Sequence, residues 1–131
     1  MLKNRVHEYY INRDYNCSEA LILAINDEYK LGLDSDTLKL LSGFGLGMGC
    51  QKTCGALCSS ISALGKLLVQ NRAHATERFS ETCADFVSCF IERLGSDQCN
   101  WLRDRYRRDD IRCLKTIELA ADVFSEFISQ R

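Results

Sequence analysis

The chain has 131 residues, of which 46% are hydrophobic and 27% are charged, as in an ordinary soluble globular protein. Its formal net charge of −1 gives no reason to expect nucleic acid or an anionic membrane as a partner. The opening residues lack the apolar stretch of a signal peptide, and the longest apolar run, ALILAI at 20–25, is too short for a membrane span. We therefore expect one cytoplasmic domain over residues 1–131.

The first half of the chain has hydrophobic residues at helical spacing. Residues 2–13 form an amphipathic segment. Asn16, with Glu19 three residues later, has the pattern of a capping box and predicts a helix that ends near Lys30. A short helix at about 35–43 then leads into the segment 43–60, which reads GFGLGMGCQKTCGALCSS.

The second half continues the helical pattern. We expect a helix from Thr53 to about residue 70 and another over about 74–94 that ends at Gly95. Ser96 or Asp97 would cap a short helix, the charged stretch 103–110 would be a solvated connection, and the last helix would begin near Asp109 or Asp110. Proline and alternating strand patterns are both absent. The prediction is an all-α, single-domain helical bundle of about five to seven helices.

The chain contains eight cysteines, and half of them fall at predicted helix starts. In the cytoplasm permanent disulfides are disfavoured, so clustered cysteines indicate metal or redox chemistry. At a helix N-terminus, free backbone N–H groups and the helix dipole favour an anion, which lowers the pKa of a thiol. We therefore expect reactive or metal-binding thiolates at Cys17, Cys54, Cys99 and Cys113.

The segment 43–60 combines cysteines and glycines. Cys50, Cys54 and Cys58 repeat every fourth residue, so Cys54 and Cys58 would share one helix face, with Cys50 folding back toward Cys54. This spacing is not that of a zinc finger, so a metal site would need ligands from distant helices. The alternating glycines do not fit a dinucleotide fingerprint, but they permit positive φ and could turn N–H groups toward sulfur. The glycines predicted to contact a cofactor are Gly47, Gly49 and Gly55.

Four stretches carry a family resemblance: NCSEA, SGFGLGMGCQKTCGAL…ALG, GSDQCNWL and CLKTIELAADVF. Together they resemble the C_GCAxxG_C_C family of redox-active proteins, in the same order and over roughly residues 5–127. A related domain accompanies haem modules in split-Soret cytochromes, where such cysteines hold an iron–sulfur site. The resemblance implies redox chemistry or cluster binding. Its motif cysteines correspond to Cys17, Cys50, Cys54, Cys99 and Cys113.

Three functions remain open from the sequence. The leading one is a redox-active protein whose cysteines 17, 50, 54, 99 and 113 hold an iron–sulfur cluster or another metal such as zinc, for electron transfer or redox sensing with a partner protein. The second is a metal-free dithiol protein, possessing no cofactor, in which Cys54 attacks and Cys50 resolves. The third is a helical scaffold or interaction module with inert thiols, which could form a homodimer. Whether the chain is an enzyme stays open.

The remaining candidates carry less weight. Cys58 flanks both Cys54 and the hydrophobic face of the helix expected from Thr53 to about residue 70. Cys83 lies among phenylalanines at helical spacing, which predicts a core position, and Cys89 has no predicted role. His7 and His74 lie on polar helix faces, far from any cysteine in the sequence. No C-x-x-C-H motif is present, so covalent haem is not expected.

Overall fold

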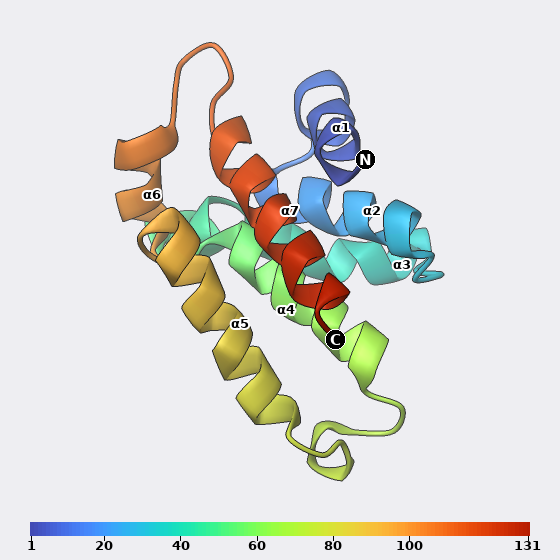
Figure 1. Cartoon of the computed structure of the whole chain (residues 1–131). Helices are drawn as coiled ribbons and strands as arrows, with labels where there is room; N and C mark the ends of the chain where they lie inside the picture. The colour runs from blue at the N-terminus through green and yellow to red at the C-terminus, as the bar shows by residue number, and fades with distance from the viewer.

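The structure, a computed structural model, describes residues 1–131 and is built from helices alone (Figure 1). It contains no β-strand, only two isolated bridges, Thr53–Gln98 and Arg108–Arg112. The prediction of an all-α bundle of five to seven helices is confirmed. The seven α-helices are α1 (Leu2–His7), α2 (Cys17–Tyr29), α3 (Ser35–Leu38), α4 (Gly55–Leu68), α5 (Phe79–Leu94), α6 (Cys99–Tyr106) and α7 (Leu114–Ser129).

Shorter helical turns connect several of these helices. The first predicted segment, residues 2–13, is α1 continued by a π-helical turn at Glu8–Asn12. The predicted helix at 35–43 is α3 followed by a 3₁₀ turn at Lys39–Phe44. The capping box is present as predicted, because the Asn16 side chain accepts from the Glu19 N–H and the Glu19 side chain accepts from the Asn16 N–H.

Four predicted helix starts were wrong by one to five residues. The helix expected from residue 74 begins at Phe79, after a left-handed residue, Arg78. The last helix begins at Leu114, after an exposed connection. The starts of α4 and α6 lie later than expected because residues 52–54 pair with residues 97–99. This pairing makes Cys54 and Gln98 the N-caps of the two helices. The charged stretch is only partly a connection, since residues 103–106 belong to α6.

Small side chains allow α2 and α4 to pack closely. Ala20, Ala24, Ala56 and Ala63 are fully buried, and the Ser18 and Ser59 hydroxyls hydrogen bond to each other at 2.8 Å inside the interface. Because small side chains keep two backbones close, the N-terminal ends of these helices can lie near each other.

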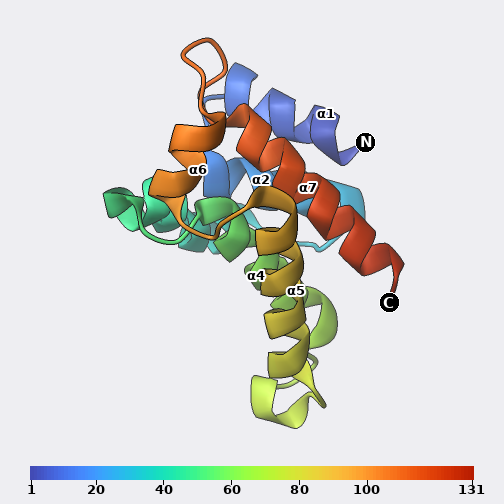
Figure 2. The ribbon, with the colours of Figure 1, turned by 60° about the vertical axis from the view of Figure 1, so that its left-hand side comes forward.

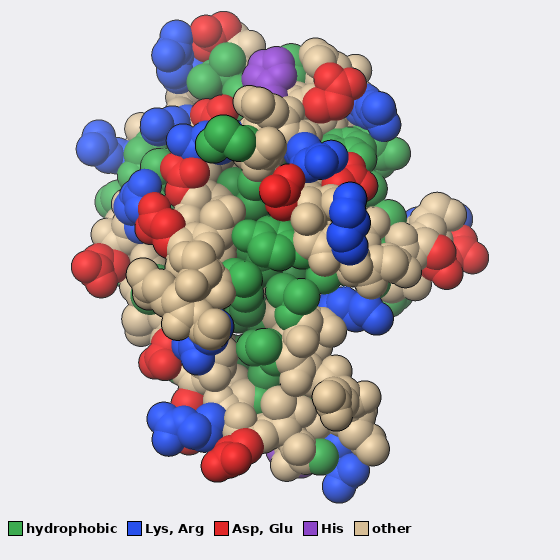
Figure 3. Space-filling view, turned by 45° about the vertical axis from the view of Figure 1, so that its right-hand side comes forward, with side chains coloured by type: hydrophobic (Ala, Val, Ile, Leu, Met, Phe, Trp, Pro, Cys, Tyr) green, Lys and Arg blue, Asp and Glu red, His purple; other side chains and the backbone are tan.

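Helix α7 completes the core by packing against α1, α4 and α5 (Figures 1 and 2). Three phenylalanine rings, Phe86, Phe124 and Phe127, meet edge to face between α5 and α7, at centroid distances of 5.2 and 6.2 Å. On the face drawn in Figure 3, hydrophobic side chains form a central band with charged side chains on both sides. None of the helices is both long enough and apolar enough to span a bilayer.

Candidate metal or redox site

Four of the five predicted metal ligands line one small cavity. Its volume is about 20 Å³, enough for a single water-sized occupant. The cavity lies between α2, α4, α6 and α7, and its wall is made of Cys17, Cys54, Gly55, Cys99, Leu102, Arg103, Cys113 and Thr116. Residues that are distant in sequence are thus brought to one place, and all eight cysteines of the chain are free thiols.

Each of these four cysteines stands at the N-terminal end of a different helix. Cys17 and Cys99 are the first residues of α2 and α6, whereas Cys54 and Cys113 are the N-caps of α4 and α7. The starts of these helices gather on one side of the molecule (Figures 1 and 2). Helix N-termini carry partial positive charge, which acts in favour of negative charge on these sulfurs.

A two-stranded pairing places Cys54 beside Cys99. The Cys54 N–H donates to the Asp97 carbonyl at 2.8 Å, and the Cys99 N–H donates to the Lys52 carbonyl at 2.6 Å. Thr53 and Gln98 face each other between these hydrogen bonds. Side chains alternate along an extended backbone, so Cys54 and Cys99 project to the same face of the pairing.

Two of the three glycines that were predicted to contact a cofactor allow the backbone of their own segment to lie close to the cysteines. A Cβ at Gly47 would lie 2.7 Å from the Cβ of Cys99, and a Cβ at Gly55 would lie 2.9 Å from the sulfur of Cys17. Both distances are below any normal carbon contact. Gly47 and Gly55 are therefore required for the close packing of the site, whereas a Cβ at Gly49 would meet no atom within 4 Å.

The segment before α4 makes a left-handed turn. Leu46, Gly47, Met48 and Gly49 all have positive φ, between 55° and 76°. This conformation costs little for glycine but is unfavourable for leucine and methionine, so the packing around the turn must maintain it. The turn leaves the side chains of Leu46 and Met48 exposed, and it places the Leu46 N–H at the sulfur of Cys17.

The expectation of a lowered pKa at Cys54 was wrong. Burial, and to a lesser degree the neighbouring Cys17 sulfur, raises the pKa of the Cys54 thiol from its ordinary 9.0 to about 12. The N–H groups of Ala56 and Leu57 face the sulfur and act in the opposite direction, without forming a cap hydrogen bond. Loss of water around a sulfur that is 5% exposed outweighs the helix N-terminus.

The Cys17 and Cys99 thiols behave in the same way. Burial raises the pKa of Cys17 and of Cys99, and nearby sulfurs raise both further. The Leu46 N–H lowers the pKa of Cys17 in part, and the Arg103 charge lowers that of Cys99 in part. Burial first, and then the neighbouring sulfurs, therefore favour the protonated form of these two thiols.

Tyr10 and Arg103 also belong to this site, although neither was expected there. The Cys113 N–H donates to the Tyr10 hydroxyl at 3.1 Å, and burial raises the pKa of this phenol. The Arg112 guanidinium covers the Tyr10 ring at 4.6 Å. Arg103 had been assigned to a solvated stretch. The helical spacing of four residues from Cys99 was the available signal for its place at the cavity.

The other cysteines lie outside the cavity. Cys50 is exposed, and its thiol donates to the Gly47 carbonyl at a sulfur–oxygen distance of 3.6 Å. Cys58 is half-buried one turn after Cys54, yet it does not reach the cavity wall. Cys83 is only half-buried and is not part of the hydrophobic core, contrary to expectation, and Cys89 is exposed. His7 and His74 are both exposed.

The four thiols do not form a finished ligand set. No three cysteine, histidine, aspartate or glutamate side chains are arranged so that they could hold one metal ion. The chemistry of the donors nevertheless fits a thiophilic centre, since four free sulfurs face a common space. Because the cavity has room for only one water-sized occupant, uptake of a metal ion or cluster would require the side chains or the glycine segment to move.

Comparison with known proteins places the chain in a family. No curated protein and no solved structure shows a significant similarity to it. Residues 15–127, which include all four cysteines of the cavity, match the family described as "Putative redox-active protein (C_GCAxxG_C_C)". The chain therefore belongs to the C_GCAxxG_C_C family.

Proposed function

We propose that this protein is redox-active through a thiolate-held metal centre, with an iron–sulfur cluster as the first candidate and zinc as the second. The observation that carries the proposal is the convergence of Cys17, Cys54, Cys99 and Cys113 on one cavity from four different helices. Cysteines that served only as small apolar core residues would not be expected to line one cavity. Membership of a redox-active family supports the same conclusion.

The electrostatics of the cavity suit a centre that carries excess negative charge. Four thiolates around a dipositive metal or cluster core leave such an excess. The helix N-termini at the four cysteines and the guanidinium of Arg103 oppose it. An iron–sulfur centre would supply one-electron transfer to a partner protein, whereas zinc would supply structural stability.

The cavity cysteines would have to release their thiol protons before they bind a metal. The pKa of Cys54 is about 12, and the pKa values of Cys17 and Cys99 are raised as well. At neutral pH each of these sulfurs carries a proton that a metal must displace. Metal uptake is therefore expected to be favoured by rising pH.

The glycine segment gives the site room to rearrange. Gly47 and Gly55 already allow backbone to touch the cysteines, and Gly49 has free space around it. Cys50 is carried by this segment, outside the cavity, and a movement of the segment could bring it in as a further ligand.

The dithiol alternative is less well supported. Its attacking thiol, Cys54, is buried and has a pKa of about 12, so almost none of it is thiolate at neutral pH. Its resolving thiol, Cys50, is exposed and does not line the cavity that contains Cys54. The alternative would require the segment between them to open.

The test is metal and sulfide analysis of protein purified without oxygen. Wild-type protein should contain iron with acid-labile sulfide, or zinc. Single serine substitutions at each of the four cavity cysteines should lower the content strongly, whereas the exposed Cys89→Ser should retain it. Metal-free wild-type protein that also resists reconstitution with iron and sulfide, or with zinc, would overturn the proposal.

A further inference from the structure

Arg103 is the charged side chain in the wall of the thiol cavity. It lies four residues after Cys99 in α6, so the two side chains share one face of the helix. None of the ten ion pairs in the structure includes Arg103, so no carboxylate neutralises its charge. An arginine beside four thiols with no acidic partner requires an explanation.

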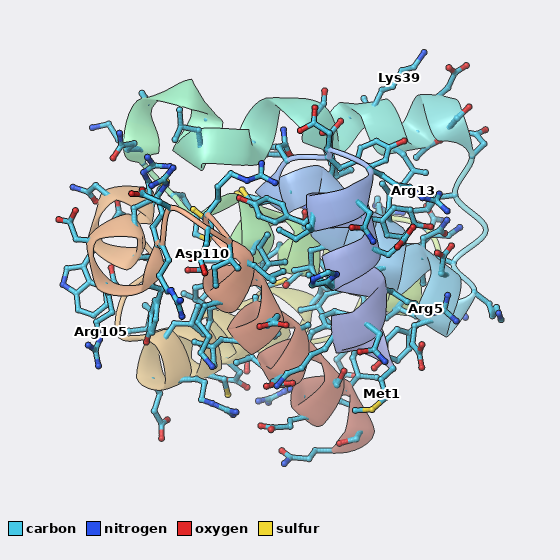
Figure 4. All side chains as sticks on the ribbon, turned by 90° about the horizontal axis from the view of Figure 1, so that it is seen from above. Met1, Arg5, Arg13, Lys39, Arg105 and Asp110 are labelled. Atoms are coloured by element: carbon cyan, nitrogen blue, oxygen red, sulfur yellow. The ribbon has the colours of Figure 1, made fainter.

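The neighbouring arginines are occupied elsewhere. Arg107 pairs with Asp109 at 3.2 Å, and Arg108 pairs with Asp110 at 3.0 Å. Arg105, which is on the same helix as Arg103, lies over the Tyr106 ring and points away from the molecule (Figure 4). Arg103 therefore differs from Arg107 and Arg108 in having no acidic partner, and from Arg105, which has none either, in lying in the cavity wall.

We infer that Arg103 is the charge partner of the bound centre and makes the cavity selective for a centre with excess negative charge. The inference rests on the proposed function. A guanidinium remains charged at every accessible pH, so its contribution does not depend on proton uptake. A negative centre in a cavity of low polarity is costly unless an opposite charge is close. Arg103 acts through the thiolates rather than as a ligand itself.

The experiment measures Cd²⁺ affinity of reduced, metal-free protein by competition with a chelator, without oxygen. Groups that contact the ligands of a metal, without binding the metal themselves, typically contribute about 10–100-fold to its affinity. Arg103→Gln should therefore weaken Cd²⁺ binding by about 10–100-fold. Arg103→Lys, which retains the charge, should recover most of this loss. Arg105→Gln is the matched control on the same helix and should bind like wild type.

The outcomes separate this inference from the proposed function. Equal affinity of wild type and Arg103→Gln would overturn the role of Arg103 while leaving the metal site intact. The same loss in Arg103→Lys and Arg103→Gln would overturn it too, because shape rather than charge would then matter. If Arg103→Gln does not fold, Arg103→Met keeps the aliphatic stem and must show the same loss. Failure of wild type to bind Cd²⁺ would instead contradict the proposed function.

Discussion

Gly55 lies against the sulfur of Cys17. A Cβ at residue 55 would be 2.9 Å from that sulfur and 2.6 Å from the Phe44 carbonyl oxygen. The first residue of α4 thus touches the first residue of α2, with the carbonyl of the preceding turn on the other side. The relationship explains how two helix N-termini can share one cavity, and it makes residue 55 sensitive to a single methyl group.

Gly55→Ala should destabilise the protein, because the new methyl group has no space. Overpacking of this kind costs about 1–3 kcal/mol of unfolding free energy. Gly65→Ala in the same helix is the control, since its Cβ would meet no atom nearer than 4.0 Å. Replacing a helix-interior glycine without a clash should stabilise by about 0.5–1 kcal/mol. Urea unfolding measures both, and shifts of the same sign would contradict the assigned packing.

Cys50 should react with iodoacetamide well before Cys54 in reduced, metal-free protein at neutral pH. Cys50 is exposed, whereas Cys54 is 5% exposed and burial raises its pKa to about 12. Thiolate is the reactive form, so both accessibility and ionisation favour Cys50. Mass spectrometry of a timed reaction gives the order. In urea the two rates should become similar, and faster labelling of Cys54 in the native protein would show that the cavity is open.

The unfolding free energy should fall as pH rises above about 9. The Cys54 thiol loses its proton near its ordinary pKa of 9.0 in the unfolded chain but only near 12 in the folded protein. Between these values the folded state binds more protons, so alkali favours unfolding. One such group contributes a slope of up to about 1.4 kcal/mol per pH unit.

One variant tests whether Cys54 causes this pH dependence of the unfolding free energy. Urea unfolding of metal-free protein at several pH values should show a smaller slope in Cys54→Ser than in wild type. Cys89→Ser, at an exposed position, should leave the slope unchanged. A slope that is the same in all three proteins would mean that Cys54 ionises equally in both states.

Tyr10→Phe should destabilise the protein by about 1–3 kcal/mol, the usual cost of leaving a buried group without its hydrogen-bond partner. The Tyr10 hydroxyl accepts from the Cys113 N–H at 3.1 Å, and the side chain is buried. Tyr15→Phe is the control, since that side chain is exposed and its ring contact with Tyr9 survives the change. Thermal unfolding distinguishes them, and equal melting temperatures would show that the Tyr10 hydroxyl contributes nothing.

The helical class and the capping box could be predicted from the sequence because both depend on local spacing. Asn16 and Glu19 lie one turn apart in any helix, so their reciprocal hydrogen bonds require no distant partner. Hydrophobic periodicity likewise reports one face of one helix. The placement of cysteines at helix starts is also local information, and each start was predicted to within five residues.

Only the tertiary structure decided that Cys50 lies outside the cavity and how the cavity cysteines ionise. The pairing of residues 52–54 with residues 97–99 joins parts of the chain that no local pattern connects, and it moved the start of α4 from Thr53 to Gly55. The tertiary structure also places Arg103 in the cavity wall. The pKa of Cys54 was predicted with the wrong sign because a helix N-terminus can be recognised in sequence, whereas the loss of water that raises this pKa requires the packing of all four helices.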